Sequence, residues 1–296
     1  MSPVPSPGPS GPVVVGILSH RDPALLRRLV DRVLEGEHTI ALVHHDPRGV
    51  PHGLVPHDRL LLVDDPQPCD WGRMNLATAM LRLLETGVAR VPDLAWLLLV
   101  SGQDYPAQHL HLTEQALARS DADAMLRWFD VPDDPHDDVH PWQTRCRTRY
   151  LHRVRVPGNR RSVPCPRPLH PFRGGTRLFI GDMWANLRAP AVHHVLEQRE
   201  RLARVERYLS RCSVPDEALL PTLLLNDADH LRISGERKRW IRWVEGSPHP
   251  ELLRPEDVPA VTASGDFFAR KVDGTATAAV LDRLDELARE ADRAHP

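Results

Sequence analysis

The sequence predicts an α/β fold with a mostly parallel central sheet and a long irregular insertion. Short apolar runs of strand type alternate with amphipathic segments of helix type over the first 128 residues. Periodicity then disappears between about residues 130 and 178, where Pro and Arg are abundant. A strand, a helix and a second strand in that order form a right-handed crossover, which makes the two strands parallel.

The first of these alternating segments follows a tail over residues 1–12 that is rich in Pro, Ser and Gly and is expected to be disordered. Residues 13–18 form an apolar run typical of a buried strand. Asp22 and Pro23 then supply a helix N-cap and a first helical residue, and Leu and Val recur on one face as far as Gly36. The next strand is expected over residues 39–44.

The later elements follow from the same patterns, and residues 13–296 are interpreted as one domain. Its nucleotide-binding half is expected over about 13–128, its acceptor and catalytic half over about 129–275. Further strands are expected at residues 60–63, 95–100, 123–128, 178–182 and 238–244, and helices at residues 72–85, 190–209, 215–225 and 277–291.

The charge balance and the cysteines limit the function classes. Lys and Arg number 38 and Asp and Glu number 40, so the net charge of −2 provides no global attraction to nucleic acid or to an anionic membrane. The four cysteines show no C-x-x-C spacing, which fits a reduced compartment. There is no basic segment followed by an apolar run at the N-terminus and no stretch of 18 apolar residues, so a cytoplasmic protein without a membrane anchor is expected.

Polar residues follow three of the predicted strands, where ligands of parallel sheets bind. Ser19 and His20 follow the first strand, Asp46 and Arg48 follow the second, and Asp104 follows the strand at 95–100. These residue types are also common in ordinary turns, so each residue alone is weak evidence. No G-x-G-x-x-G follows the first strand, which argues against a dinucleotide-binding enzyme.

Two later segments carry candidate catalytic groups. Glu217 lies in the first turn of a predicted helix, where Ser213 is expected to be the N-cap and Asp216 to close a capping box. A purely structural helix start is the alternative. Arg270 and Lys271 follow Phe267 and Phe268, and such a cation pair is either a solvated edge or a clamp for a diphosphate.

Two other segments resemble sites of different kinds. Residues 133–140 are rich in Asp and His, but their charge density and Pro favour a solvated loop, and no metal is assigned to them. Arginines alternate over residues 145–155 as if along one face of a strand, which resembles a nucleic-acid stripe. Because aromatic residues are few there, an acidic acceptor or local salt bridges are the favoured interpretation.

Taken in order, the motifs resemble the core-2/I-branching β-1,6-N-acetylglucosaminyltransferase and peptide O-xylosyltransferase group, glycosyltransferase family 14. The resemblance spans about residues 13–273, and each motif alone is weak. Its segments are residues 17–20, 44–46, 71–72, 99–106, 181–184, 215–217, 249–250 and 268–271.

The resemblance implies a GT-A type fold, an inverting displacement, a UDP-sugar donor of N-acetylglucosamine or xylose type, an acceptor hydroxyl and no metal or other cofactor. Glu217 is then the general base, and Arg270 and Lys271 neutralise the leaving diphosphate. The resemblance further implies that the nucleotide is bound by Ser19, His20, Asp46 and Arg48. It implies that the sugars are contacted by Asp104, Asp182, Trp184 and Asp216.

The chain also departs from the family. Residues 181–184 read Gly-Asp-Met-Trp, where family members place the aromatic directly after the polar residue, so the sugar is left open. Neither the lumenal anchors nor the disulfides of the animal enzymes are expected in this chain, so their acceptors are not carried over. A catalytically silent module that binds a nucleotide sugar or a glycan on the same fold is the alternative function.

Overall fold

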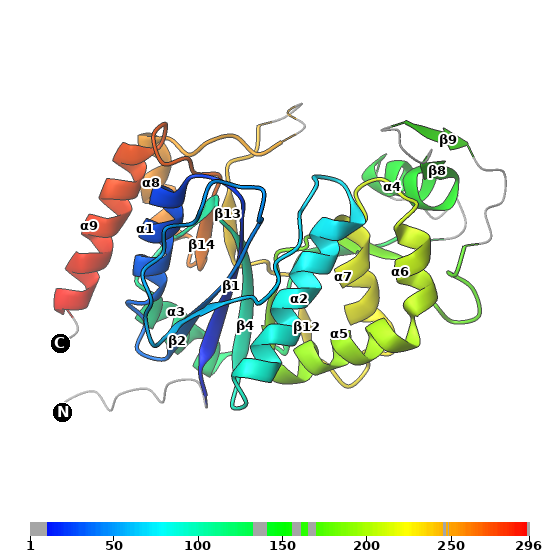
Figure 1. The fold of residues 1–296 in the computed structure, drawn as a ribbon, viewed down its shortest axis with the longest axis horizontal. Helices are drawn as coiled ribbons and strands as arrows, with labels where there is room; N and C mark the ends of the chain where they lie inside the picture. Colours follow the sequence, from blue (N-terminus) through cyan, green and yellow to red (C-terminus); the bar gives the residue numbers. More distant parts are fainter. Residues whose placement is uncertain are drawn as a thin grey trace. The chain divides into compact units, whose positions relative to one another are not determined.

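The computed structural model describes residues 11–132, 141–155, 161–164, 170–244, 247 and 249–294. The chain forms two compact units that are interleaved along the sequence. Unit 1 comprises residues 1–66, 86–121 and 238–296, and unit 2 comprises residues 67–85 and 122–237. Figure 1 shows the elements of both units. The predicted division of the chain near residue 128 stays a prediction.

Unit 1 contains a parallel sheet, as predicted. Strands β1 (Val13–Ser19), β2 (Thr39–His45), β3 (Leu60–Leu62) and β4 (Trp96–Ser101) are ordered β4-β1-β2-β3. Every residue of β1 is buried, because strands lie on both sides of it and helices cover the sheet. In the register, Leu18 lies beside both His44 and Ser101, so these strands end at one edge.

The helices of unit 1 form where the sequence predicts them, with additions. In α1 (Pro23–Val33), the Asp22 side chain accepts a hydrogen bond from the Leu25 amide, which confirms the predicted N-cap. The terminal helix is α9 (Ala278–Ala294), and Figure 1 shows it beside α1. The patterns missed α3 (Leu110–Arg119), α8 (Val258–Ala263) and the short 3-10 helix at Pro255–Asp257.

A second, three-stranded sheet in unit 1 brings together three distant segments. Its order is β13 (Arg239–Ile241), β14 (Phe268–Arg270) and β5 (Asp104–Pro106). Strand β14 runs parallel to β13 and antiparallel to β5. The sequence predicted only β13. This sheet places Asp104 directly opposite Arg270.

Unit 2 is built around a buried helix. Helix α7 (Asp216–Leu225) packs against α5 (Ala189–Arg201), α6 (Ala203–Leu209) and β10 (Phe179–Gly181). The Thr222 hydroxyl donates to the Phe179 carbonyl and accepts from the Phe179 amide, which fixes β10 on α7. The unit's other elements are α2 (Met74–Arg90, to Glu85 within unit 2), β6 (Ala124–Met125), β7 (Trp128–Asp130), α4 (Pro141–Leu151), β8 (Arg153–Arg155), β9 (Ser162–Pro164), β11 (Asn186–Arg188) and β12 (Ile233–Ser234).

Three predictions for this unit were wrong in detail. The strand expected at 123–128 is two strands, β6 and β7, which pair with different partners. The helix expected at 190–209 is interrupted at Leu202. The segment at 130–178 is not wholly irregular, because α4 lies within it and places Cys146, Tyr150 and other residues in the interior.

The alternating arginines also do not line a single strand, as the sequence had suggested. Arg145 to Arg149 are helical, and Arg153 and Arg155 lie on β8.

The described cysteines are thiols. Cys69, Cys146 and Cys212 form no disulfide. Burial raises the pKa of Cys146 and of Cys212 to about 12, so both are inert at neutral pH.

Within the described part of the chain, no helix is long and apolar enough to cross a membrane.

Candidate active site

In unit 1, polar groups of neighbouring strand ends are joined by hydrogen bonds. The Ser19 hydroxyl lies 2.8 Å from His45 Nδ1, and His45 Nε2 lies 2.7 Å from the Val50 carbonyl. Since a carbonyl only accepts, Nε2 carries a proton, and in the neutral ring Nδ1 then accepts from Ser19. The Asp46 amide also donates to the Ser19 carbonyl at 2.8 Å. The predicted convergence of Ser19 and Asp46 at one edge is therefore found in the structure.

Asp46 and Arg48 form an ion pair with each other. Arg48 donates from its amide and Nε to Asp46 Oδ1, and from Nη2 to Oδ2 at 2.9 Å. The Asp46 side chain is 4% exposed, whereas that of Arg48 is 51% exposed. A ligand at this edge therefore meets the Arg48 guanidinium, with Asp46 behind it.

A group of cations lies near His20. Burial is the largest cause that lowers the pKa of Lys271, and its neighbours Arg270 and Arg21 lower it further. Burial and Arg21 lower the pKa of His20, Asp46 opposes them, and His45 and Lys271 add to the lowering. Because the cations disfavour one another, a bound anion would relieve their repulsion.

Asp104 is fully buried, which differs from the expected contact with a sugar. Its Oδ2 accepts from the Ser101 amide at 2.7 Å and from the Ser101 hydroxyl at 2.5 Å. Its Oδ1 lies 3.2 Å from Arg239 Nε and 3.9 Å from Arg270 Nε. The carboxylate is thus directed into the protein, toward two guanidinium groups.

In unit 2, Glu217 lies in the first turn of α7, as predicted, although the cap differs. The helix begins after Pro215, and no side chain caps it, so the predicted capping box of Ser213 and Asp216 was wrong. Val214 adopts a positive φ of 56°, which turns the preceding chain away from the geometry of such a box.

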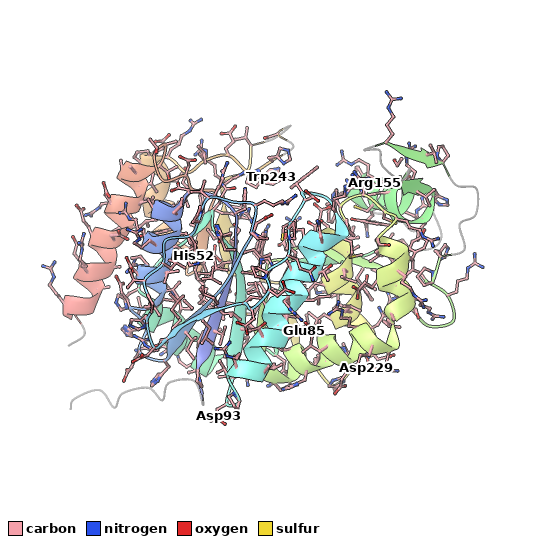
Figure 2. All side chains as sticks on the ribbon, viewed as in Figure 1. His52, Glu85, Asp93, Arg155, Asp229 and Trp243 are labelled. Carbon is pink, nitrogen blue, oxygen red and sulfur yellow. The ribbon has the colours of Figure 1, made fainter. Side chains whose placement is uncertain are left out.

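Hydrogen bonds from other segments hold the start of α7. The Val214 amide donates to the Gly72 carbonyl at 3.2 Å, and the Tyr150 hydroxyl donates to the Val214 carbonyl at 2.6 Å. Gly72 adopts a φ of 67°, which favours glycine, and its carbonyl also accepts from Arg155, labelled in Figure 2. The backbone before Glu217 is therefore fixed from two sides.

Glu217 is paired with a cation. Arg149 Nη1 on α4 lies 2.9 Å from Glu217 Oε2, and the Glu217 side chain remains 39% exposed. Burial raises the pKa of Glu217 above its usual range, Arg149 opposes this, and Asp182 adds to the rise. This carboxylate is accessible and held in one orientation, as a general base requires.

The neighbouring carboxyl of Asp216 has a different environment. Burial, and secondarily the charge of Glu217, raises the pKa of Asp216 to about 7, although its own backbone and Arg149 lower it. Its Oδ1 is buried and has no hydrogen-bond partner among the described residues. Asp216 is thus a poorly solvated acid beside the more accessible, half-buried Glu217.

The remaining predicted residues follow β10. The Asp182 carboxylate lies 3.3 Å from Arg237 Nη1 and contributes to the charge environment of Glu217. Gly181 is required before it, since a Cβ there would lie 2.2 Å from the Arg127 carbonyl oxygen. Trp184 follows in the same loop and is partly exposed. The structure therefore brings Asp182 near Glu217 within unit 2.

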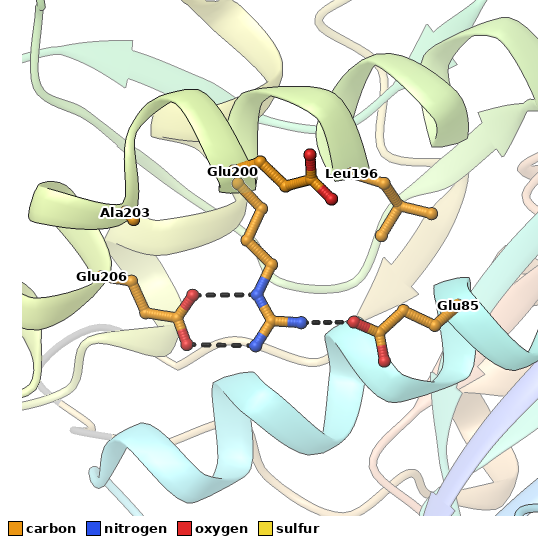
Figure 3. A pocket seen from close by; sticks show the side chains of 6 residues that line it. Glu85, Leu196, Glu200, Ala203 and Glu206 are labelled. Carbon is orange, nitrogen blue, oxygen red and sulfur yellow. Dashed lines mark hydrogen bonds and ion pairs between the residues drawn. The ribbon is translucent and has the colours of Figure 1, made fainter.

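A surface pocket of about 410 Å³ in unit 2 contains none of these residues (Figure 3). Arg199 in its wall donates to both oxygens of Glu206 and to Glu85. Since this cation is neutralised by carboxylates, we do not assign a phosphate to the pocket.

Among the described residues, no group of three or more His, Cys, Asp or Glu is arranged to hold a metal ion. The acidic segment at 133–140 lies outside the described residues.

The sequence patterns missed three arginines that contact or lie near candidate residues, one in unit 2 and two in unit 1. Arg149 pairs with Glu217, Arg239 contacts Asp104, and Arg21 lies near Lys271. Arg21 directly follows Ser19 and His20, which was an available signal. Arg149 and Arg239 reach their partners only through the tertiary fold, so their positions in the sequence gave no indication.

The family model described as Core-2/I-Branching enzyme matches residues 55–263, which is more than half of the chain. The chain belongs to the Core-2/I-branching enzyme family. It is accordingly a glycosyltransferase, and the family implies a nucleotide-sugar donor and an acceptor. The match includes Asp104, Asp182, Trp184, Asp216 and Glu217. The other candidate residues lie outside it, so their assignment rests on their place in unit 1. No curated protein matches the chain.

Proposed function

We propose that this glycosyltransferase has a GT-A type fold and moves a sugar, of N-acetylglucosamine or xylose type, from a UDP-sugar to an acceptor hydroxyl with inversion and without a metal ion. The observation that carries the proposal is Glu217. It is an accessible carboxylate, held by Arg149 at the start of a buried helix, in a chain of this family.

Glu217 acts as the general base. In a single displacement, the acceptor oxygen forms a bond to the anomeric carbon from the face opposite the leaving group, and the bond to the diphosphate breaks. The acceptor proton passes to the Glu217 carboxylate, and the electron pair of the broken bond leaves on the β-phosphate oxygen. A positioned base accelerates such a step by roughly 10²–10⁴.

Arg270 and Lys271 stabilise the leaving diphosphate. The β-phosphate gains a negative charge as the glycosidic bond breaks, so fixed cations favour the transition state over the bound donor. Burial lowers the pKa of Lys271 most, and Arg270 and Arg21 lower it further, which supports a local positive field around Lys271. Removing one cation should therefore reduce turnover at least as much as donor binding.

The other residues bind the substrates. Ser19, His20, Asp46 and Arg48 form the nucleotide edge of unit 1, with Arg48 as its accessible donor. Asp182, Trp184 and Asp216 contact the sugars in unit 2, where the Trp184 indole offers an apolar face to a pyranose ring. Asp104 is fully buried, so we propose no contact between it and a sugar.

The proposal of metal independence rests on the residues that follow β4. Gln103 and Asp104 occupy this position, where a metal-dependent enzyme of this type would need an Asp-x-Asp. Asp104 is buried against two guanidinium groups, which is an unfavourable environment for a divalent cation. Cys69, Cys146 and Cys212 form no disulfide, which supports a cytoplasmic location.

The test is a screen of UDP-sugars with the purified chain, in which release of UDP and melting temperature are measured together. We expect one UDP-sugar to be consumed, and Glu217→Gln to bind UDP as tightly as the wild type while losing most of its turnover. Binding of UDP without turnover of any donor would instead favour a catalytically silent module. If Glu217→Gln transfers sugar within about threefold of the wild type, which is about 0.65 kcal/mol of barrier, Glu217 is not the base.

A further inference from the structure

Two consecutive residues near the end of α4 hold the start of α7 at different points. Arg149 pairs with the carboxylate of Glu217. The next residue, Tyr150, reaches the backbone of the same segment, where its hydroxyl donates to the Val214 carbonyl at 2.6 Å. The Glu217 amide donates to that same carbonyl at 3.4 Å. One carbonyl oxygen therefore joins the Tyr150 hydroxyl to the backbone of the proposed base.

The residue that carries this carbonyl has an unfavourable backbone conformation. Val214 adopts a φ of 56°, in the left-handed region, which is costly for a β-branched residue. Such a conformation persists only where the surrounding structure fixes it. Two hydrogen bonds do so here, from the Val214 amide to the Gly72 carbonyl and from the Tyr150 hydroxyl to the Val214 carbonyl. If the second bond is lost, we expect Val214 to relax and the first turn of α7 to move with it.

Tyr150 is suited to hold this turn because it is fixed in place and its hydroxyl stays a donor. The residue is fully buried, and its own carbonyl accepts from the Tyr208 hydroxyl at 2.5 Å. Burial raises the pKa of Tyr150 well above its usual range, although the charge of Arg149 opposes this rise. The hydroxyl is therefore protonated throughout the neutral pH range.

We propose that Tyr150 is a positioning residue for the glycosyl transfer, whose hydroxyl holds the turn at Val214 so that the Glu217 carboxylate meets the acceptor hydroxyl. This rests on the proposed function, because it assumes that Glu217 is the general base. A base takes a proton only within hydrogen-bond reach, so a displacement of about 1 Å is enough to slow the transfer. Tyr150 is buried and acts only through the segment that carries Glu217.

The competing explanation is that Tyr150 only stabilises the fold. Tyr105 is a matched control for that role, because it is also fully buried and its hydroxyl donates to Asp285 at 2.6 Å. Tyr105→Phe removes the same atoms and a hydrogen bond of the same length, but not the bond to Val214. Both variants should therefore lose similar stability, and only Tyr150→Phe should lose the orientation of the base.

The experiment compares the two variants of the full chain in three measurements. These are melting temperature, UDP affinity by calorimetry, and UDP release at saturating concentrations of the donor that the UDP-sugar screen identifies. We expect Tyr150→Phe to lower turnover about tenfold and to keep UDP affinity within about twofold of the wild type. Tyr105→Phe should keep turnover within about twofold. Wild-type turnover in Tyr150→Phe, or an equal loss of turnover in Tyr105→Phe, overturns the inference.

Two double variants separate positioning from stability. In Glu217→Gln, Tyr150→Phe should cost no further turnover, because the base that it positions is absent, whereas independent losses would multiply. In Val214→Gly, the left-handed φ costs little, so Tyr150→Phe should slow turnover less than it slows the wild type. A multiplicative loss in the first double variant, or an undiminished loss in the second, overturns the inference.

The outcomes for the base and for Tyr150 are distinguishable. If Glu217→Gln keeps wild-type turnover, the general base of the proposed function fails. Normal turnover in Tyr150→Phe beside an inactive Glu217→Gln removes only the role of Tyr150. If Tyr150→Phe alone does not fold, the comparison with Glu217→Gln is made in the Val214→Gly background, where a multiplicative loss again overturns the inference.

Discussion

Replacing Arg149 by Met should move the acid limb of the pH profile of kcat/KM to higher pH. Arg149 lies 2.9 Å from the carboxylate of Glu217 and opposes the rise in the pKa of Glu217 that burial causes. The base is active only as a carboxylate, so activity is lost as the pH falls through this pKa. Removing the cation makes the carboxylate less favourable, and the limb therefore shifts upward.

The size of the shift follows from the geometry. Two unit charges about 4 Å apart interact by about 4 kcal/mol at an effective dielectric constant of about 20. The side chains of Arg149 and Glu217 are 33% and 39% exposed, so water and salt screen most of this energy. About 1 kcal/mol remains, and since a change of one pH unit corresponds to 1.36 kcal/mol, we expect a shift of somewhat less than one unit.

The assay is UDP release at saturating donor and low acceptor, from about pH 4.5 to 9, in low and high salt. Arg145→Met is the control, because Arg145 lies four residues earlier on α4 and is exposed. It makes the same charge change without contacting Glu217. The reasoning fails if the limb of Arg149→Met stays in place or moves to lower pH, or if Arg145→Met shifts it equally.

Three other outcomes are expected. Lys271→Ala should weaken UDP affinity by roughly ten- to a hundredfold in calorimetry and slow turnover at least as much, and equal affinity with unchanged turnover would remove Lys271 from the site. Turnover should survive excess EDTA, and a loss that Mn²⁺ or Mg²⁺ restores would disprove metal independence. Asp216→Asn should stabilise the protein at pH 8, by up to about 4 kcal/mol in urea unfolding. The pKa of Asp216 is raised from 3.8 to about 7 in the folded state, so the unfolding free energy of the wild type falls between these pH values as the pH rises. If Asp216→Asn raises the free energy of unfolding no more at pH 8 than at pH 4, the pKa of Asp216 is not raised in the folded protein.

Local patterns identified most of the regular elements because their signals are short-range. The apolar run of β1 and the Asp22–Pro23 start of α1 each depend on neighbouring residues, and both are found where expected. The separation of β6 from β7 depends on partners far along the chain, because β6 pairs with β11 and β12 whereas β7 pairs with β10. Such breaks were therefore not apparent.

The sequence by itself determined the α/β pattern, the order of the motifs and the residue types available for chemistry. Glu217 could be placed in the first turn of a helix because helix starts are local. Its partner could not be identified, because Arg149 lies 68 positions away and alternates with other arginines in a pattern that resembled a strand. Asp104 looked like a ligand residue after β4, but β14 and β13 bring two arginines onto its face of the sheet. Only the tertiary structure decides which charges become neighbours and which lose water, because burial and Coulomb interactions depend on distance in space.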